Sequence, residues 1–273
     1  MENSNRNSNT APKGIWHHRD LLMQFTLRNV EMKHKGSALG FTWSIVSPLL
    51  LLVLYVGVFG FIFGGSFKVV PNETRMDYAL GVFLGLSIFH YLAEVIGIAP
   101  LLIISNPNLV KKVLFPLEIL PVAQVLAATF HLAISLVLIV IGIVFFGNGL
   151  AWSILWLPVF IVPMAFMALG ISWAASALGV FFRDLTQITQ FATMALMFAS
   201  AIFYPASLIP EQVAWIMKLN PLLLVVEISR NTLLWGMPVP PRELAYIYGS
   251  CGLIAWIGHR IFLKTKSAFA DVI

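Results

Sequence analysis

Charged residues are scarce in this sequence, and cysteine is almost absent. Only 11% of the 273 residues are Asp, Glu, Lys or Arg, while 59% are hydrophobic. A soluble domain carries about 25% charged residues, and a compact soluble fold could not bury this much apolar surface. The composition therefore excludes an ordinary soluble enzyme and predicts an all-α membrane protein. The single cysteine, Cys251, cannot form a disulfide within the chain.

Several motifs that would indicate catalysis are also missing. GxxxxGK[ST], HExxH, GxSxG and CxxC do not occur. We therefore expect no catalytic residue, no metal site and no bound cofactor, and any transported solute must be driven by a partner or by a gradient. His90 and Glu94 lie four residues apart on one predicted helix face. This spacing is compatible with a metal site or a proton relay, and equally with a hydrogen-bonded pair that fixes packing.

Long apolar runs are what the sequence has in abundance. A membrane-spanning helix needs about 20 predominantly apolar residues. Six runs approach or exceed this length, and we predict them as spans: 41–63, 78–104, 117–146, 151–182, 185–204 and 244–263. The stretch 205–242 between the last two holds six prolines and five charged residues. Such a stretch favours short external helices that re-enter the membrane rather than one more span.

The distribution of Lys and Arg predicts the orientation. With the N-terminus inside, 12 of the 17 basic residues fall in segments assigned to the cytoplasm. This bias predicts that both chain ends, including the tail 264–273, are cytoplasmic, and it explains the net charge of +5 without a nucleic-acid partner. Residues 1–14 are polar and predicted to be disordered. Residues 15–36 are charged, with apolar side chains on two opposite faces, which predicts a helix lying between the lipid interface and the protein.

A short basic segment, 105–116, interrupts two of the most apolar runs. Its sequence, SNPNLVKKVLFP, places about two helical turns between Pro107 and Pro116. Two turns are not stable alone in water. The segment carries apolar residues to bury as well as Lys111 and Lys112. We interpret it as an element that docks on another protein, although a plain basic turn between two spans would also explain the lysines.

Several motifs, taken together, resemble one family. Residues 19–63 carry the pattern R-D-L … R-x-x-x-x-x-K-G-S-x-L-G-x-x-W-x-x-x-x-P. This pattern resembles the amino-terminal signature of the membrane subunits of ATP-binding-cassette polysaccharide exporters, the permeases for O-antigen, capsule and wall teichoic acid. Asn29 stands where that family usually has Asp, which weakens the inference of a salt bridge there. Further matches follow in the family's order: NPNLVKKVLFPLEILP, FFRDL, FYPASLIPE, LNPL and FADVI.

The resemblance implies a six-span permease of the bacterial cytoplasmic membrane that forms a homodimer and binds two ATPase subunits. ATP would be bound by those partners, and the exported cargo would be a lipid-linked polysaccharide. It implies an interface helix at about 16–34 and a coupling segment at about 105–117. The residues assigned to ATPase contact are Asn108, Lys111, Lys112, Leu114, Phe115, Arg183 and Asp184, although the last two could instead simply pair with each other.

The first span also carries an aromatic stripe. Tyr55, Phe59 and Phe63 recur every four residues on one helix face. Given the resemblance, we expect them to line a channel along which sugar rings slide, whereas aromatics facing lipid are the alternative. Glu227 and Arg230, three residues apart, are expected to pair outside the membrane.

Three rival functions remain at this stage. One is an exporter of the same architecture for a drug or a lipid. A gradient-driven transporter would call for matching inverted halves, which the sequence does not show. A membrane-embedded glycan enzyme would need a carboxylate cluster on an external loop, and Glu211 and Glu227 are too sparse for one.

Overall fold

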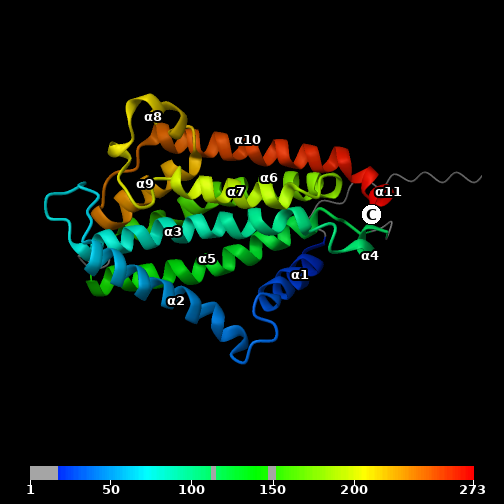
Figure 1. Ribbon diagram of the computed structural model, residues 1–273, viewed down its shortest axis with the longest axis horizontal. Helices are drawn as coiled ribbons and strands as arrows, with labels where there is room; N and C mark the ends of the chain where they lie inside the picture. Colours follow the sequence, from blue (N-terminus) through cyan, green and yellow to red (C-terminus); the bar gives the residue numbers. More distant parts are fainter. Residues whose placement is uncertain (1–17, 112–114, 147–151) are drawn as a thin grey trace, which may run out of the picture.

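The computed structural model describes residues 18–111, 115–146 and 152–273. Within these ranges the regular structure is entirely helical (Figure 1). The predicted tail 1–14 lies outside the described residues, and so do Lys112 and Leu114. The rest forms a helical bundle that confirms the predicted all-α membrane class.

Within the described ranges, four helices are long and apolar enough to cross a membrane. The first runs over Gly40–Phe63 and comprises the 3-10 turn η2 (Gly40–Thr42), α2 (Trp43–Tyr55) and the π-helical segment η3 (Val56–Phe63). The others are α3 (Arg75–Ile98) with the turn η4 (Ala99–Leu101), α5 (Ile119–Phe146), and the turn η5 (Trp152–Trp156) leading into α6 (Leu157–Phe181). They lie on the first four predicted runs.

The fifth and sixth predicted spans are less clear-cut. Helix α7 (Leu185–Phe198) has 14 residues, and at 1.5 Å per residue it extends about 21 Å, short of the roughly 30 Å hydrocarbon core. Helix α10 (Pro241–Thr265) has 25 residues and is long enough. It is less apolar, because polar residues and Arg260 interrupt it, and it is not among the four. The total of six spans therefore stays a prediction.

The proline-rich stretch between them folds into the turn η6 (Ala206–Leu208), α8 (Glu211–Met217) and α9 (Pro221–Trp235). Helices α8 and α9 meet at an angle of 96°, the geometry of a broken span or a re-entrant loop. The Asn220 side chain caps α9 by accepting a hydrogen bond from the Leu222 amide, 3.1 Å away. Helix α9 is inserted into the bundle, since Leu222, Val225 and Val226 are fully buried.

Glycines set how closely the helices approach one another. A Cβ atom at Gly81 or Gly85 of α3 would lie within about 3 Å of α9 side chains, Arg230 and Val226 respectively. Helices α6 and α10 are closer still, because a Cβ atom at Gly258 would lie 2.0 Å from the Gly170 carbonyl oxygen. Small residues allow this kind of backbone contact in membrane bundles.

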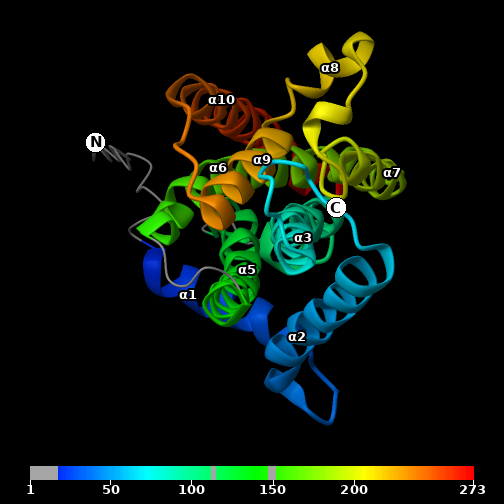
Figure 2. The ribbon, with the colours of Figure 1, turned by 90° about the vertical axis from the view of Figure 1, so that its left-hand side faces the viewer.

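The short elements gather at the two ends of the bundle. Helix α1 (Arg19–Met32), α4 (Pro107–Val110), the turn η7 (Lys266–Ala268) and α11 (Phe269–Val272) lie toward one end. The loop 64–74 and α8 lie at the other end (Figure 1). The first span, Gly40–Phe63, leans away from the rest of the bundle at α2, and only 6% of its most apolar 18 residues are buried (Figure 2).

Candidate functional site

A second, smaller apolar core lies at the α4 end of the bundle, separate from the main core. Its buried members include Val110, Leu117, Phe262 and Phe269. Phe25 of α1 packs against it and meets Phe115 edge to face, with 5.6 Å between ring centroids. We call this group the end core. It joins α1, the segment around α4 and the C-terminal turn, which are far apart in sequence.

The predicted two helical turns between the prolines are described only in part, because residues 112–114 lie outside the described residues. Helix α4 covers only Pro107–Val110, and α5 begins at Ile119. The described apolar residues of this segment pack within the chain, and the docking of the segment on another protein stays a prediction. Val110 and Leu117 are buried in the end core, and Phe115 is half-buried against Phe25. The chain's own helices satisfy them, so the described residues that remain outward-facing are polar: Asn108 and Lys111 are exposed.

An ion pair joins two of the segments that surround the end core. Lys266 Nζ of η7 lies 2.7 Å from Glu118 Oε1, at the start of α5. Glu118 is largely buried and Lys266 is about one-third exposed, so the pair is shielded from water on one side. A partly buried pair with this short contact is stronger than a surface pair. It ties the C-terminal turn to the segment that follows α4.

Arg183 and Asp184 are exposed at the junction of α6 and α7. No ion pair joins them in the described structure, and Asp184 precedes α7 without capping it through its side chain. Phe181 lies beside Phe269 of α11, with ring centroids 6.2 Å apart. The junction therefore borders the end core, on the same end as Asn108 and Lys111.

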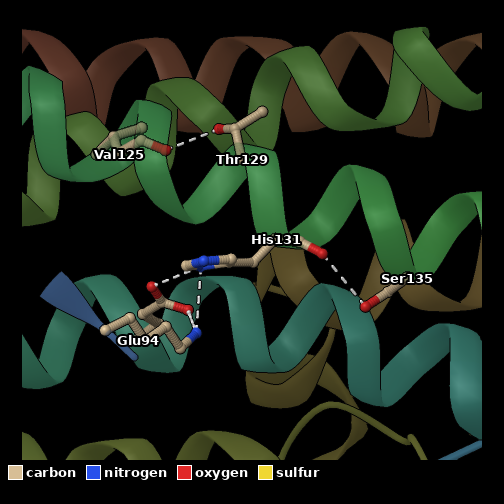
Figure 3. A network of polar contacts seen from close by, with 6 residues as sticks. Glu94, Val125, Thr129, His131 and Ser135 are labelled. Atoms are coloured by element: carbon tan, nitrogen blue, oxygen red, sulfur yellow. Dashed lines mark hydrogen bonds and ion pairs between the residues drawn. The ribbon is translucent and has the colours of Figure 1, made fainter. Parts of the chain in front are cut away.

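A polar cluster fastens α1 to two membrane helices. Lys33, which ends α1, places its Nζ 2.6 Å from Glu94 Oε2 on α3 and 3.1 Å from His131 Nδ1 on α5. His131 Nδ1 is also 3.1 Å from Glu94 Oε1, and the two side chains point toward each other between α3 and α5 (Figure 3). The carboxylate is largely buried, with 17% of its side chain exposed. We call these three residues the Glu94 cluster.

The predicted pairing of His90 with Glu94 is not how the carboxylate is used. Among the described residues, no hydrogen bond or ion pair joins His90 to Glu94. Both line a cavity of about 280 Å³ that also contacts the start of α2. Outside the spans, His34 follows Lys33, and burial together with that cation lowers the pKa of His34, so it is neutral at pH 7. Sequence reasoning singled out Glu94 but missed Lys33, whose only signal was a cation near the predicted span.

Glu94→Ala is expected to loosen α1 from the bundle. The change leaves Lys33 and His131 facing a partly buried position without their carboxylate, and removing one partner of such a pair costs about 3–5 kcal/mol when burial is complete and less here. The measurement is protease cleavage within 33–40 in detergent-purified protein, which should accelerate in the variant. Lys33→Met with Glu94→Leu removes both charges and should restore protection. Equal cleavage of all three proteins would contradict the cluster's role.

Two residues of the aromatic stripe on the first span pack against the bundle, and the third is exposed. Phe59 stacks on Phe203, with centroids 5.4 Å apart, and Tyr55 lies 6.4 Å from Phe83 of α3. Phe63 stacks on Phe59 at 5.7 Å and is 70% exposed. Tyr55 and Phe59 are thus half-buried packing residues, and the π-helical turn extends the stripe outward at Phe63.

Arg230 was predicted to lie outside the membrane in a pair with Glu227, and the structure buries it instead. It is 1% exposed, and its guanidinium lies 3.6 Å from the centre of the Phe67 ring. One nitrogen donates to the Ala201 carbonyl at 3.4 Å. No ion pair with Glu227 forms in the described residues, so the predicted external pair is wrong. The helix turns Arg230 inward onto an aromatic face, which compensates the buried charge.

Known proteins match this chain over most of its length. An O-antigen export system permease protein RfbA from Klebsiella pneumoniae is 27% identical over 255 residues, covering 93% of this chain and 95% of that protein. Another RfbA, from Myxococcus xanthus, is 25% identical and covers 95% and 97%. The polysialic acid transport protein KpsM from Escherichia coli is 25% identical and covers 89% and 92%. The family model for ABC-2 type transporters matches residues 21–234. With more than half of its length matched, and with the helical bundle described above, the chain belongs to the ABC-2 type transporter family.

Proposed function

We propose that this chain is the membrane subunit of an ABC exporter that moves a lipid-linked polysaccharide across the bacterial cytoplasmic membrane. The observation that carries the proposal is the near full-length similarity to relatives named for O-antigen export and polysialic acid transport. The chain itself lacks a nucleotide-binding motif, so a separate ATPase subunit supplies the energy. No feature of the described structure favours a drug or a free lipid as cargo instead.

The ATPase contacts this chain on the polar surface that surrounds the end core. Asn108, Lys111, Arg183 and Asp184 present polar groups outward around it, and Lys112 and Leu114 belong to the same segment of sequence. The end core and the Glu94 cluster link that surface to α1, α3 and α5. A push on α4 therefore reaches the spanning helices through packed side chains. This end is cytoplasmic in the orientation that Lys and Arg favour.

The functional unit is a homodimer bound to two ATPase subunits. The outward face of α2 and the exposed residues Ile188, Phe191 and Met194 of α7 are apolar. Two copies facing each other through α2 and α7 would enclose a path lined in part by Phe63 and the half-buried rings behind it. Aromatic faces accept the CH groups of sugar rings without a fixed hydrogen-bond pattern, which suits a long polymer that must slide.

Lys111→Glu is expected to reduce co-purification of the ATPase about tenfold, because an exposed cation becomes an anion at the contact surface. The assay is affinity capture of the tagged permease from cells that express both subunits, at low and high salt. Lys68→Glu makes the same charge change at the opposite end and should leave capture unchanged. Full capture by Lys111→Glu would remove this surface from the proposal.

The cargo is tested by deleting the gene. Surface polysaccharide should be lost on deletion and restored by the wild-type chain.

A further inference from the structure

A cavity of about 680 Å³ lies between α8, α9 and the start of α10. It is at the opposite end of the molecule from the end core, where α8 and α9 face the viewer in Figure 2. Its volume falls within the range of about 300–1,000 Å³ that holds small organic ligands. None of the roles described so far uses it.

The walls of the cavity are tied together by hydrogen bonds. Tyr246 of α10 donates its hydroxyl to the Leu219 carbonyl at 2.8 Å, which fixes α10 to the end of α8. Gly236 adopts a left-handed conformation with φ +64°, and the Met237 amide donates back to the Asn231 carbonyl at 3.2 Å. This closure ends α9 and turns 237–240 over the cavity. The site is thus pre-formed.

Behind the α9 wall lie two buried polar atoms that have no partner in the described chain. The Thr232 side chain is only 2% exposed, and its hydroxyl oxygen makes no hydrogen bond. The side-chain oxygen of Asn231 is likewise buried and unpaired. Both residues line the cavity. Buried polar atoms are nearly always hydrogen-bonded, and an unsatisfied one costs about 1–3 kcal/mol. These two atoms have no surface open to the cavity as it stands, so a ligand would satisfy them only after their side chains rotate toward it.

The charges around the cavity select the class of ligand. Glu227 and Glu243 bring two carboxylates, and Lys218 and Arg242 bring two cations, so the lining has no net formal charge. Carboxylates accept from hydroxyl groups, and the cations donate to ring and hydroxyl oxygens. The α9 wall carries no cation toward the cavity, whereas a phosphate needs donors on its deepest side. Tyr246, 38% exposed, adds an aromatic face for the CH side of a ring.

From these observations we propose that the cavity binds a short saccharide stretch of the exported polymer as it leaves the membrane. The inference rests on the proposed function, because it takes its ligand from that cargo and its location from that orientation. Binding of one or two sugar units at the exit would favour forward movement of the chain, since a held segment cannot slide back. Asn231, Thr232 and Glu227 are the residues that would read its hydroxyl groups.

The test uses a cysteine introduced at Ser207, an exposed residue of the cavity rim. The native Cys251 is fully buried and serves as an internal unreactive thiol. A membrane-impermeant maleimide is added to spheroplasts that express the full transporter, with polysaccharide synthesis on or off. If the site is occupied about nine-tenths of the time during export, labelling of Ser207→Cys slows about tenfold. Gln212→Cys, exposed on α8 and outside the cavity lining, should label equally in both states.

A second pair of variants assigns the effect to the cavity wall. Asn231→Leu with Thr232→Val replaces the unpaired polar atoms by apolar groups of similar size, and it should abolish the protection of Ser207→Cys. Surface polysaccharide, measured in the same cells, keeps the two proposals separate. Export with unchanged labelling overturns the saccharide site and leaves the proposed function standing. Absence of export by the wild-type chain overturns the proposed function. Protection that persists without polysaccharide synthesis overturns the site in favour of a lipid headgroup.

Discussion

Gly258→Ala is expected to lower the free energy of unfolding by about 3 kcal/mol or more, the upper part of the range for overpacked cores. The added methyl group would lie 2.0 Å from the Gly170 carbonyl oxygen and 2.7 Å from the Gly170 Cα. Backbone atoms cannot rotate away as a side chain does, so α10 must move off α6 along their contact. The reciprocal change, Gly170→Ala, would bring a methyl group 2.3 Å from the Ile254 carbonyl oxygen and should have a similar effect.

The matched control for this prediction is on the same helix. Gly252 lies six residues earlier in α10, and a Cβ atom there would meet nothing within 4 Å. Gly252→Ala should therefore be neutral or stabilising, by up to about 1 kcal/mol from helix propensity. Thermal unfolding of the detergent-purified protein, followed by size-exclusion chromatography, measures both. A melting temperature for Gly258→Ala within error of Gly252→Ala would show that α6 and α10 are not packed through these glycines.

The membrane class and the first four long helices could be predicted from sequence, because lipid imposes a length and an apolar composition that can be counted residue by residue. The same counting did not locate the end of α7. Its apolar run continues to Tyr204, yet the helix ends at Phe198 and the chain turns through Ala201, which has a positive φ of 49°. Tertiary packing sets that break, since Ala201 is fully buried and accepts a hydrogen bond from Arg230. No local pattern reports such a contact.

In the candidate site, too, the sequence identified single unusual residues but not the residues that they contact. Spacing identified Glu94 as an intramembrane carboxylate and the 105–116 segment as unusual, because both stand out against apolar neighbours. Spacing could not identify their partners. Lys33 is 61 residues from Glu94 in sequence, and Phe25 is far from Phe115, so only the fold brings them together. The error about Arg230 has the same origin, because a helix face predicted to meet water meets the Phe67 ring.

Phe115→Asp is expected to reduce polysaccharide export about 5- to 150-fold, the range of a typical coupling free energy, while the ATPase remains bound. Phe115 is half-buried against Phe25 and reaches the end core, so a carboxylate there would open the contact between the α4 segment and α1. The exposed polar residues Asn108 and Lys111 would still meet the ATPase. The ATPase would then continue to hydrolyse ATP without moving the spanning helices, because the α4 segment would no longer pack against α1.

Co-reconstitution of the permease with its ATPase in proteoliposomes measures the two steps separately. ATP hydrolysis and polysaccharide transfer are followed in parallel for Phe115→Asp, for Phe115→Leu, which keeps an apolar contact, and for Phe25→Asp, which attacks the same contact from α1. Coupling through the end core requires that both Asp variants hydrolyse ATP at near wild-type rates with little transfer, and that the Leu variant transfers normally. Undiminished transfer by Phe115→Asp would contradict coupling through this contact. Loss of ATPase binding would instead make Phe115 part of the docking surface, so that force enters the bundle through Phe115 itself and not through the polar residues around it.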